Sequence, residues 1–252
     1  MKLEDYETVI GLEVHVELAT KTKIFCGCST AFGGAPNTRI CPVCAGMPGT
    51  LPVLHKKVGE FAVSVGLGTN CRISPVTRFD RKNYFYPDNP QNYQISQLYL
   101  PICRDGFVEL DLDKEALDDT AKSGGTNTAF TDGNRKNAGR KRIRIHEIHM
   151  EEDAGKLIHD EERGISLVDY NRAGVPLIEI VSEPDMGNAQ EVIAYLEKLR
   201  ELIRYLGVSD CRMQEGSMRA DVNLSVRERG TDGLWTRTEM KNLNLFTAIR
   251  HA

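Results

Sequence analysis

The 252-residue sequence contains no apolar run long enough to cross a membrane, and its first residues do not form the apolar core of a signal peptide. It therefore predicts a cytoplasmic protein that does not associate with membranes. Basic residues (32) do not outnumber acidic residues (36), so any nucleic-acid contact must be local rather than spread over a basic surface. The absence of a Gly-x-x-x-x-Gly-Lys-Ser/Thr motif excludes a Walker-type phosphate loop.

Charged side chains alternate with aliphatic ones near the N-terminus. In an extended strand, Glu13, His15 and Glu17 share one face, because successive side chains point to opposite faces. Two carboxylates that flank an imidazole are suited to binding a hard cation or to proton transfer. An exposed sheet face explains this segment, taken alone, equally well.

Three further segments combine apolar residues with carboxylate or amide groups. Glu179 lies in the middle of an apolar run and, if buried, needs a cation, a metal or a raised pKa. Asp221 and Asn223 alternate with aliphatic residues, and the third segment runs into three consecutive acids at 151–153. We interpret these segments as strands of a mainly antiparallel sheet in an α+β fold, with helices on one face and an acidic, ligand-binding concavity on the other. The four segments are residues 11–18, 142–152, 175–181 and 221–226.

The seven cysteines do not indicate a disulfide scaffold in a protein expected to be cytoplasmic. Four of them form Cys-x-Cys, twelve residues and Cys-x-x-Cys within a Gly- and Pro-rich stretch, residues 19–53. This spacing suits tetrahedral zinc in a closed structural site; four reduced thiols are the alternative. The four residues are Cys26, Cys28, Cys41 and Cys44. We expect the other three, Cys71, Cys103 and Cys211, to be inert.

Helical spacing of apolar residues predicts a helix over 54–67. A second helix follows a capping box made by Asn188 and Glu191. A third begins after residue 244 and is still open at Ala252, which predicts a fragment of a longer protein. Residues 118–140 contain almost no large apolar side chain, so we expect a mobile insertion there.

Five motifs together resemble the B subunit of the aspartyl/glutamyl-tRNA amidotransferase, and the resemblance covers nearly the whole chain. It implies that residues 1–252 are the family's catalytic "cradle" domain, whose fold is similar to that of glutamine synthetase. We expect the helical and tail domains of the family to follow residue 252, outside this sequence. The motifs are residues 8–18 (TVIGLEVHVEL), 79–88 (FDRKNYFYPD), 149–156 (HMEEDAGK), 176–184 (PLIEIVSEP) and 241–244 (KNLN).

The resemblance implies an activity. In this family ATP phosphorylates the side-chain carboxylate of Glu-tRNA(Gln) or Asp-tRNA(Asn). Ammonia, which the A subunit releases from glutamine, then displaces the phosphate to give Gln-tRNA(Gln) or Asn-tRNA(Asn). The family is thus a carbon–nitrogen ligase that uses ATP and Mg²⁺, and its partners are the A and C subunits and misacylated tRNA.

The resemblance also implies site residues. Because attack of a carboxylate on a phosphate gathers negative charge, Mg²⁺ ions held by oxygen ligands are expected. His15, Glu152 and Glu179 are the expected ligands of one Mg²⁺, and Glu13 is expected to contribute to the same site. His15 is an unusual Mg²⁺ ligand, and the alternative is that it orients a bound water. Glu151 and Asp153 are expected to support these ligands, or Asp153 only braces the turn that follows.

Two cations are candidates for phosphate contacts. Arg219 and Lys241 are suited to bind ATP phosphates, and structural salt bridges to neighbouring acids are the alternative. Asp221 and Asn223 are expected to face the same concavity and to belong to this ATP-binding group.

The loop from Asp80 to Tyr93, within a stretch at 79–97 that is rich in Tyr, Asn and Pro, has two interpretations. Arg81 and Lys82 with the tyrosines Tyr84 and Tyr86 would bind the single-stranded end of tRNA, or pack against the A subunit and line the path of ammonia. We favour the A subunit for the aromatic residues.

Two other functions compete with the ligase. One is a zinc-knuckle RNA-binding module without catalysis, which a basic stripe would favour; the chain is net acidic. The other is a metal-dependent hydrolase that uses Glu13, His15 and Glu152, and consumption of ATP would separate it from the ligase. The insertion at 118–140 is longer than the family pattern, and the zinc cysteines vary within the family, so catalysis is not expected to depend on zinc.

Overall fold

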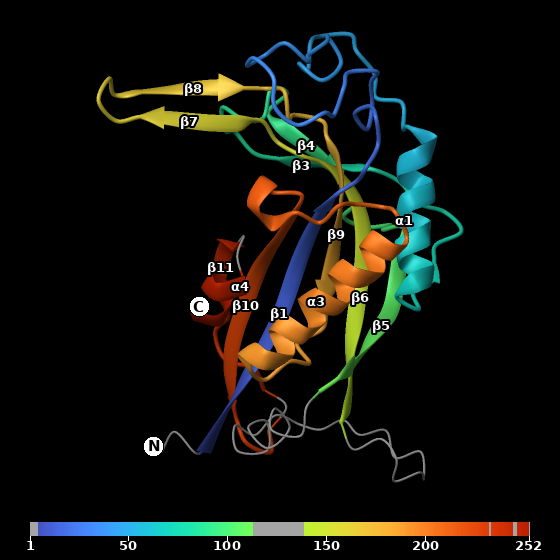
Figure 1. The fold of residues 1–252 in the computed structure, drawn as a ribbon, viewed down its shortest axis with the longest axis vertical. Coiled ribbons are helices and arrows are strands. Elements are labelled where there is room, and N and C mark those ends of the chain that lie inside the picture. Colours follow the sequence, from blue (N-terminus) through green and yellow to red (C-terminus); the bar gives the residue numbers. More distant parts are fainter. Residues whose placement is uncertain (1–4, 113–138, 232, 244–245, 252) are drawn as a thin grey trace.

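The protein is built on one antiparallel sheet of seven strands, seen in a computed structural model that describes residues 5–112, 139–231, 233–243 and 246–251. The strand order is β11-β10-β1-β9-β6-β5-β2 (Figure 1). All four predicted strands are present and adjacent, as β10, β1, β9 and β6, so the prediction of one mainly antiparallel sheet is confirmed. The strands are β1 (Tyr6–Glu17), β2 (Arg72–Ile73), β5 (Cys103–Asp111), β6 (Arg140–Glu152), β9 (Pro176–Ser182), β10 (Met218–Glu228) and β11 (Thr238–Leu243).

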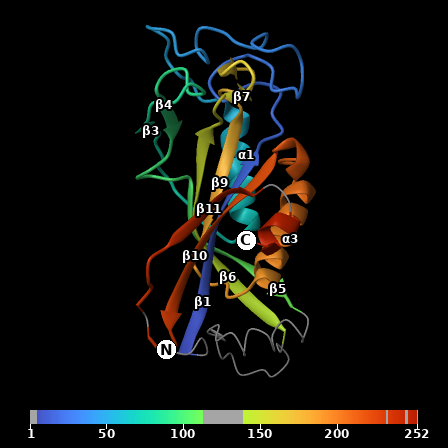
Figure 2. The same cartoon turned by 90° about the vertical axis from the view of Figure 1, so that its left-hand side faces the viewer.

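Helices cover one face of this sheet. Both α1 (Lys56–Gly68) and α3 (Ala189–Tyr205) lie across the face that receives the aliphatic side chains of β1, and Leu12, Val14 and Val16 are wholly buried there (Figure 1). Burying these side chains supplies the hydrophobic driving force that holds helices and sheet together. Within the described residues, the short pair β3 (Asp80–Asn83) and β4 (Tyr93–Ser96) lies near one end of the opposite face (Figure 2).

Helix α3 begins as the sequence predicts, with Asn188 at its N-cap. The side chain of Asn188 accepts a hydrogen bond from the backbone N–H of Glu191 at 2.9 Å. Glu191 makes further contacts of its own. Its fully buried carboxylate accepts from the N–H of Gly187 at 2.7 Å and from Lys141 Nζ at 2.7 and 2.8 Å. The buried ammonium of Lys141 needs an anion, and Glu191 is the partner that α3 brings to it.

The remaining elements lie at the two ends of the sheet. The hairpin β7 (Lys156–Asp160) and β8 (Ile165–Asp169) projects from the end that also carries the cysteine segment (Figure 1). A short 3₁₀ helix (Met213–Glu215) precedes β10, and α4 (Phe246–His251) is the helix predicted after residue 244. The expected insertion at 118–140 lies outside the described residues except for its last two, and Arg140 already begins β6. None of the helices in the described ranges is long and apolar enough to cross a membrane.

Candidate functional site

Three adjacent strands bring two histidines and a glutamate together on the open face. In the strand register, His15 of β1 pairs with Glu179 of β9, and Glu179 pairs with His149 of β6. Oε2 of Glu179 lies 3.3 Å from Nε2 of His15 and 3.0 Å from Nε2 of His149. Glu151, two residues beyond His149, lies 3.7 Å from each imidazole. The apolar run around Glu179 therefore carries its carboxylate into a cationic pocket.

These contacts control the protonation of all three groups. Burial opposes a charged imidazole at His15, but the hydrogen bond to Glu179 and the charges of Glu179 and Glu151 raise its pKa. The pKa of His149 is raised well above its usual value by its bonds to Glu147, Glu151 and Glu179, despite burial. Burial likewise opposes ionisation of Glu179, yet the two imidazoles hold its pKa far below the usual range. The Glu179 carboxylate is thus ionised and balanced by imidazolium, and a divalent cation is able to take over that balancing charge.

One group of possible metal ligands is His15, Glu151 and Glu179, whose ligand atoms lie within 4.8 Å of one another. The structure thus gathers Glu151, rather than the expected Glu152, with His15 and Glu179, while the identity of the Mg²⁺ ligands stays a prediction. Strand alternation places Glu151 on the face of His149 and Glu152 on the other side. The carboxylate of Glu152 instead accepts from the N–H of Ile95 at 3.0 Å and from the Gln91 side chain. Burial raises the pKa of Glu152 to about 7, although these two donors oppose the rise.

A second group of possible ligands is Glu13, Asp221 and Glu239, again within 4.8 Å of one another. Glu13 belongs to this group rather than to the one with His15, and its contribution to a site shared with His15 stays a prediction. Asn223 Nδ2 donates to Oε1 of Glu13 at 3.0 Å, while the buried Oδ1 of Asn223 has no hydrogen-bond partner in the described chain. In the structure, Asp221 is thus a possible cation ligand and Asn223 a support for Glu13.

Both candidate phosphate-binding cations form ion pairs. Nη2 of Arg219 lies 3.1 Å from Oδ2 of Asp153, and its buried Nε has no partner among the residues described. Arg172 approaches the same carboxylate at 3.6 Å. Lys241, whose side chain is 64% exposed, lies 3.0 Å from Glu239. The salt-bridge alternative describes both cations, and their contact with phosphate stays a prediction.

The strand pair β3–β4 forms one wall of a cleft of about 240 Å³ over the histidine group. Arg81 and Lys82 line it together with Glu147, His149 and Glu179. The Arg81 guanidinium lies over the ring of Tyr93, 4.7 Å from its centre. Of the two aromatic residues of the predicted interface, Tyr84 is half-buried and Tyr86 is exposed. Burial raises the pKa of Tyr84 to about 12.

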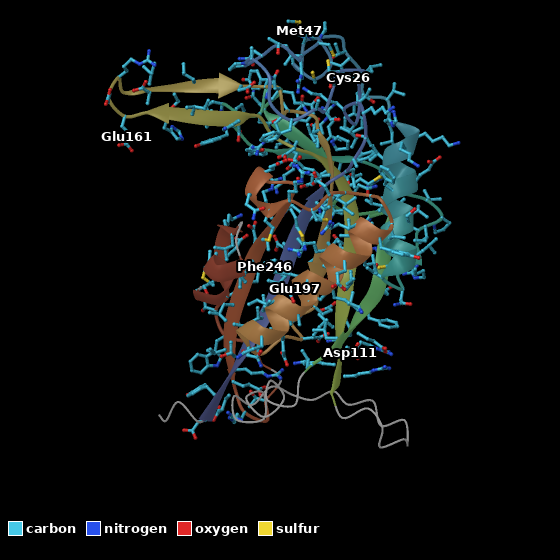
Figure 3. All side chains as sticks on the ribbon, in the orientation of Figure 1. Cys26, Met47, Asp111, Glu161, Glu197 and Phe246 are labelled. Atoms are coloured by element: carbon cyan, nitrogen blue, oxygen red, sulfur yellow. The ribbon has the colours of Figure 1, made fainter. Side chains whose placement is uncertain are left out.

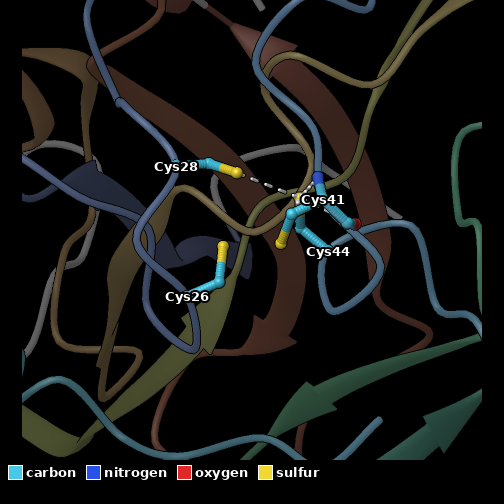
Figure 4. A group of neighbouring side chains, drawn as sticks. All are labelled: Cys26, Cys28, Cys41 and Cys44. Atoms are coloured by element: carbon cyan, nitrogen blue, oxygen red, sulfur yellow. Dashed lines mark hydrogen bonds between the residues drawn. The ribbon is translucent and has the colours of Figure 1, made fainter. Parts of the chain in front are cut away.

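The four grouped cysteines converge at the end of the sheet beyond β1, in the segment where Cys26 and Met47 are labelled (Figure 3). Their sulfurs lie within 4.8 Å of one another, and Sγ of Cys44 is 3.9 Å from those of Cys28 and Cys41 (Figure 4). The hydrogen bond with Cys26 is the main cause that lowers the pKa of Cys44 to about 4. Four sulfurs at this separation fit a tetrahedral metal. The other three cysteines, Cys71, Cys103 and Cys211, are buried, and burial raises the pKa of each.

The described chain is an α+β domain whose open sheet face carries two groups of possible metal ligands, one of two carboxylates with an imidazole and one of three carboxylates. Comparison with known proteins identifies the family of this domain. The chain belongs to the family described as the GatB/GatE catalytic domain, whose model matches residues 8–252.

Curated relatives share this assignment, and each is named as the B subunit of an aspartyl/glutamyl-tRNA(Asn/Gln) amidotransferase. The chain is 68% identical over 250 residues to the protein of Agathobacter rectalis, covering 99% of this chain and 48% of that protein. The relative from Lachnospira eligens is also 68% identical over 250 residues, which cover 99% of this chain and 47% of that protein. That of Caldicellulosiruptor saccharolyticus is 54% identical over 248 residues, covering 98% and 47%. The chain therefore spans about half the length of the curated relatives it matches.

Sequence reasoning missed two members of the site, His149 and Glu239, and gave Glu151 only a supporting role. Residues 147–151 read Glu-x-His-x-Glu, the same alternation as residues 13–17. Reading that alternation would have selected His149 and Glu151 as face residues instead of the consecutive acids at 151–153. Glu239 has no comparable pattern, because it reaches the site only through the pairing of β11 with β10.

Proposed function

We propose that this chain is the catalytic domain of the B subunit of an amidotransferase that acts on Glu-tRNA(Gln) or Asp-tRNA(Asn). A side-chain carboxylate oxygen of the aminoacyl group attacks the γ-phosphorus of ATP, and ADP leaves. Ammonia then attacks the carbonyl carbon of the acyl phosphate, phosphate leaves and a proton is lost, which gives the amide. The observation that carries the proposal is the pair of ligand groups on one sheet face, built around Glu13 and His15, two residues apart on β1.

The two groups suit the charge that this reaction gathers. Bound Mg²⁺ would neutralise the γ-phosphate and align the attacking carboxylate with it. His149 holds Glu179 in place by a hydrogen bond, and Asn223 does the same for Glu13, so the ligands are oriented before a cation arrives. We assign one Mg²⁺ to His15, Glu151 and Glu179, and a second to Glu13, Asp221 and Glu239.

Cations at the rim of the face supply phosphate contacts in this proposal. The Nε of Arg219 offers a buried hydrogen-bond donor, and the ammonium of Lys241 offers an exposed one. Because Asp153 fixes the Arg219 guanidinium, the donor is held beside His15, its partner in the strand register.

The cleft under β3–β4 would admit the substrates. Arg81 and Lys82 are placed to meet the phosphates of the acceptor end of misacylated tRNA. We assign Tyr84 and Tyr86 to contact with the A subunit, which supplies ammonia from glutamine, within an assembly that includes the C subunit. The open face would then be the floor of a cradle similar to that of glutamine synthetase.

We propose a structural zinc ion at the four cysteines. The site has four sulfur donors, which would fill the tetrahedral coordination of zinc as in closed structural sites. Zinc would fold the segment at 19–53 into a fixed knuckle, without a role in phosphoryl transfer.

The test is release of γ-phosphate from ATP by the intact protein with its A and C subunits. Release should require both Mg²⁺ and misacylated tRNA. Glu151→Gln should lower it about 100-fold, because a charged ligand is lost. Glu152→Gln, the same change one residue later, should lower it much less. Release that does not depend on charged tRNA would refute the ligase proposal, and equal losses in both variants would refute the ligand assignment.

A further inference from the structure

A lysine is buried completely beside the cysteine group. Lys23 has no exposed surface, and its Nζ has two contacts, one with Sγ of Cys44 at 3.5 Å and one with the carbonyl oxygen of Tyr170 at 3.2 Å. No carboxylate of the described residues forms an ion pair with it. Neither contact alone offsets the free energy of removing an ammonium from water. The anion that compensates Lys23 must therefore come from the cysteine group.

Four thiolates around Zn²⁺ carry a net charge of −2, so a metal-loaded knuckle has a surplus of negative charge in a partly buried place. Cys44 is the sulfur that the chain supports most: the N–H of Cys41 donates to it at 3.2 Å, and Lys23 donates from the other side. We propose that Lys23 is the counter-cation of the zinc–tetrathiolate centre and raises its affinity for zinc through Cys44. This rests on the zinc site proposed above.

The same lysine attaches the knuckle to the sheet. Its ammonium binds Tyr170, and the N–H of the next residue, Ile24, donates to the carbonyl of Gly174 at 2.9 Å. Gly174 has φ = +83°, and a Cβ there would lie 3.5 Å from both Cys44 Cβ and Lys23 Cδ. The N–H of Gly174 donates to the carbonyl of Asp153, which is the residue that fixes Arg219. Zinc, Lys23 and the segment leading into β9 thus form one continuous contact.

The first experiment compares Lys23→Met with Lys21→Met in the intact protein. Lys21 is exposed and two residues away, so the second variant removes the same charge without touching the cysteine group. Metal content is measured by elemental analysis, and affinity by competition with a chromogenic zinc chelator. We expect one zinc per chain in the wild type and in Lys21→Met. In Lys23→Met we expect a dissociation constant at least tenfold higher, because a unit charge 3.5 Å from a ligand sulfur is lost.

The outcomes separate the two proposals. A wild-type protein that binds no zinc would refute the zinc site itself. Zinc bound equally well by Lys23→Met and Lys21→Met would leave the zinc site intact and overturn the role of Lys23. Neither result depends on ATP or tRNA, so the ligase proposal is judged separately.

A second experiment does not require Lys23→Met to fold. Cys44→Ser and Cys28→Ser each remove one ligand, but Lys23 contacts only Cys44 of these two. In EDTA, where neither variant holds zinc, we expect Cys44→Ser to lower the urea midpoint more, because it also leaves Lys23 without its anion. Adding Lys23→Met to Cys44→Ser should raise the urea midpoint part of the way back to the wild-type value. Adding it to Cys28→Ser should not raise the midpoint. Equal losses in the two serine variants would overturn the proposal.

Discussion

One carboxylate on the open face is expected to hold a proton at neutral pH. Glu17 is hydrogen-bonded to Asp153, and Asp153 is kept ionised by Arg219 at 3.1 Å and Arg172 at 3.6 Å. Burial, together with the charge of Asp153, raises the pKa of Glu17 to about 8 from 4.5. The proton of this acid pair therefore belongs to Glu17, and the folded state gives it up at a higher pH than the unfolded chain does.

The consequence is a loss of stability as pH rises. Between pH 4.5 and about 8 the unfolded chain has already released the proton that folded Glu17 retains, so the free energy of unfolding falls by about 1.4 kcal/mol per pH unit. The full interval would correspond to about 5 kcal/mol, and partial exposure of Glu17 reduces this to about 2 kcal/mol. Glu17→Gln keeps a donor toward Asp153 and cannot ionise. It should match the wild type at pH 5 and be about 2 kcal/mol more stable at pH 8.5.

Urea unfolding at pH 5, 7 and 8.5, in EDTA and without nucleotide, measures this difference. Glu7→Gln is the control on the same strand: it breaks the ion pair with Arg227 and should give no gain at high pH. If Glu17→Gln were less stable than the wild type by the same amount at all three pH values, Glu17 would not be the protonated member of the pair.

Three further outcomes follow from named contacts. Asn223→Ala should raise the KM for Mg·ATP about tenfold in steady-state kinetics, because Glu13 loses its orienting donor; Ser225→Ala on the same strand should not. Lys141→Met should lower the free energy of unfolding by about 3–5 kcal/mol, since Glu191 is left buried without its cation, and Lys141→Met/Glu191→Leu should recover much of it in the same urea titration. Removal of zinc should lower the melting temperature and leave the KM for Mg·ATP unchanged; a large rise in KM would show that the knuckle reaches the catalytic face.

Much of the sheet follows from alternation in the sequence. Each of the strands β1, β9, β6 and β10 places aliphatic side chains on the face that the helices cover. The burial of these side chains was therefore predictable from each strand by itself. The edge strands were not predicted, because β2 has only two residues and β11 has no clear alternation. The capping role of Glu191 was also only half predictable: its local position favours a box, whereas its buried partner, Lys141, lies fifty residues earlier in the sequence.

The site was less predictable than the sheet, because its membership depends on register. Sequence places Glu151 and Glu152 side by side, and both carry the same chemistry. Only the pairing of His149 with Glu179 decides that Glu151 shares their face, while Glu152 turns toward Gln91 and Ile95. A shift of one residue in the register would exchange the two glutamates.

The same register shows what the strand between the two Glu-x-His-x-Glu strands contributes. Direct pairing of β1 with β6 that set His15 opposite His149 would place imidazole against imidazole and carboxylate against carboxylate, which is repulsive when the groups are charged. Inserting β9 places the single carboxylate of Glu179 between His15 and His149, at 3.3 and 3.0 Å. Each histidine then pairs with the same carboxylate on β9. Glu151 completes the group of possible ligands for a metal cation, whose charge would replace that of the imidazolium groups. The isolated glutamate in an apolar strand is therefore the residue on which the whole ligand group depends.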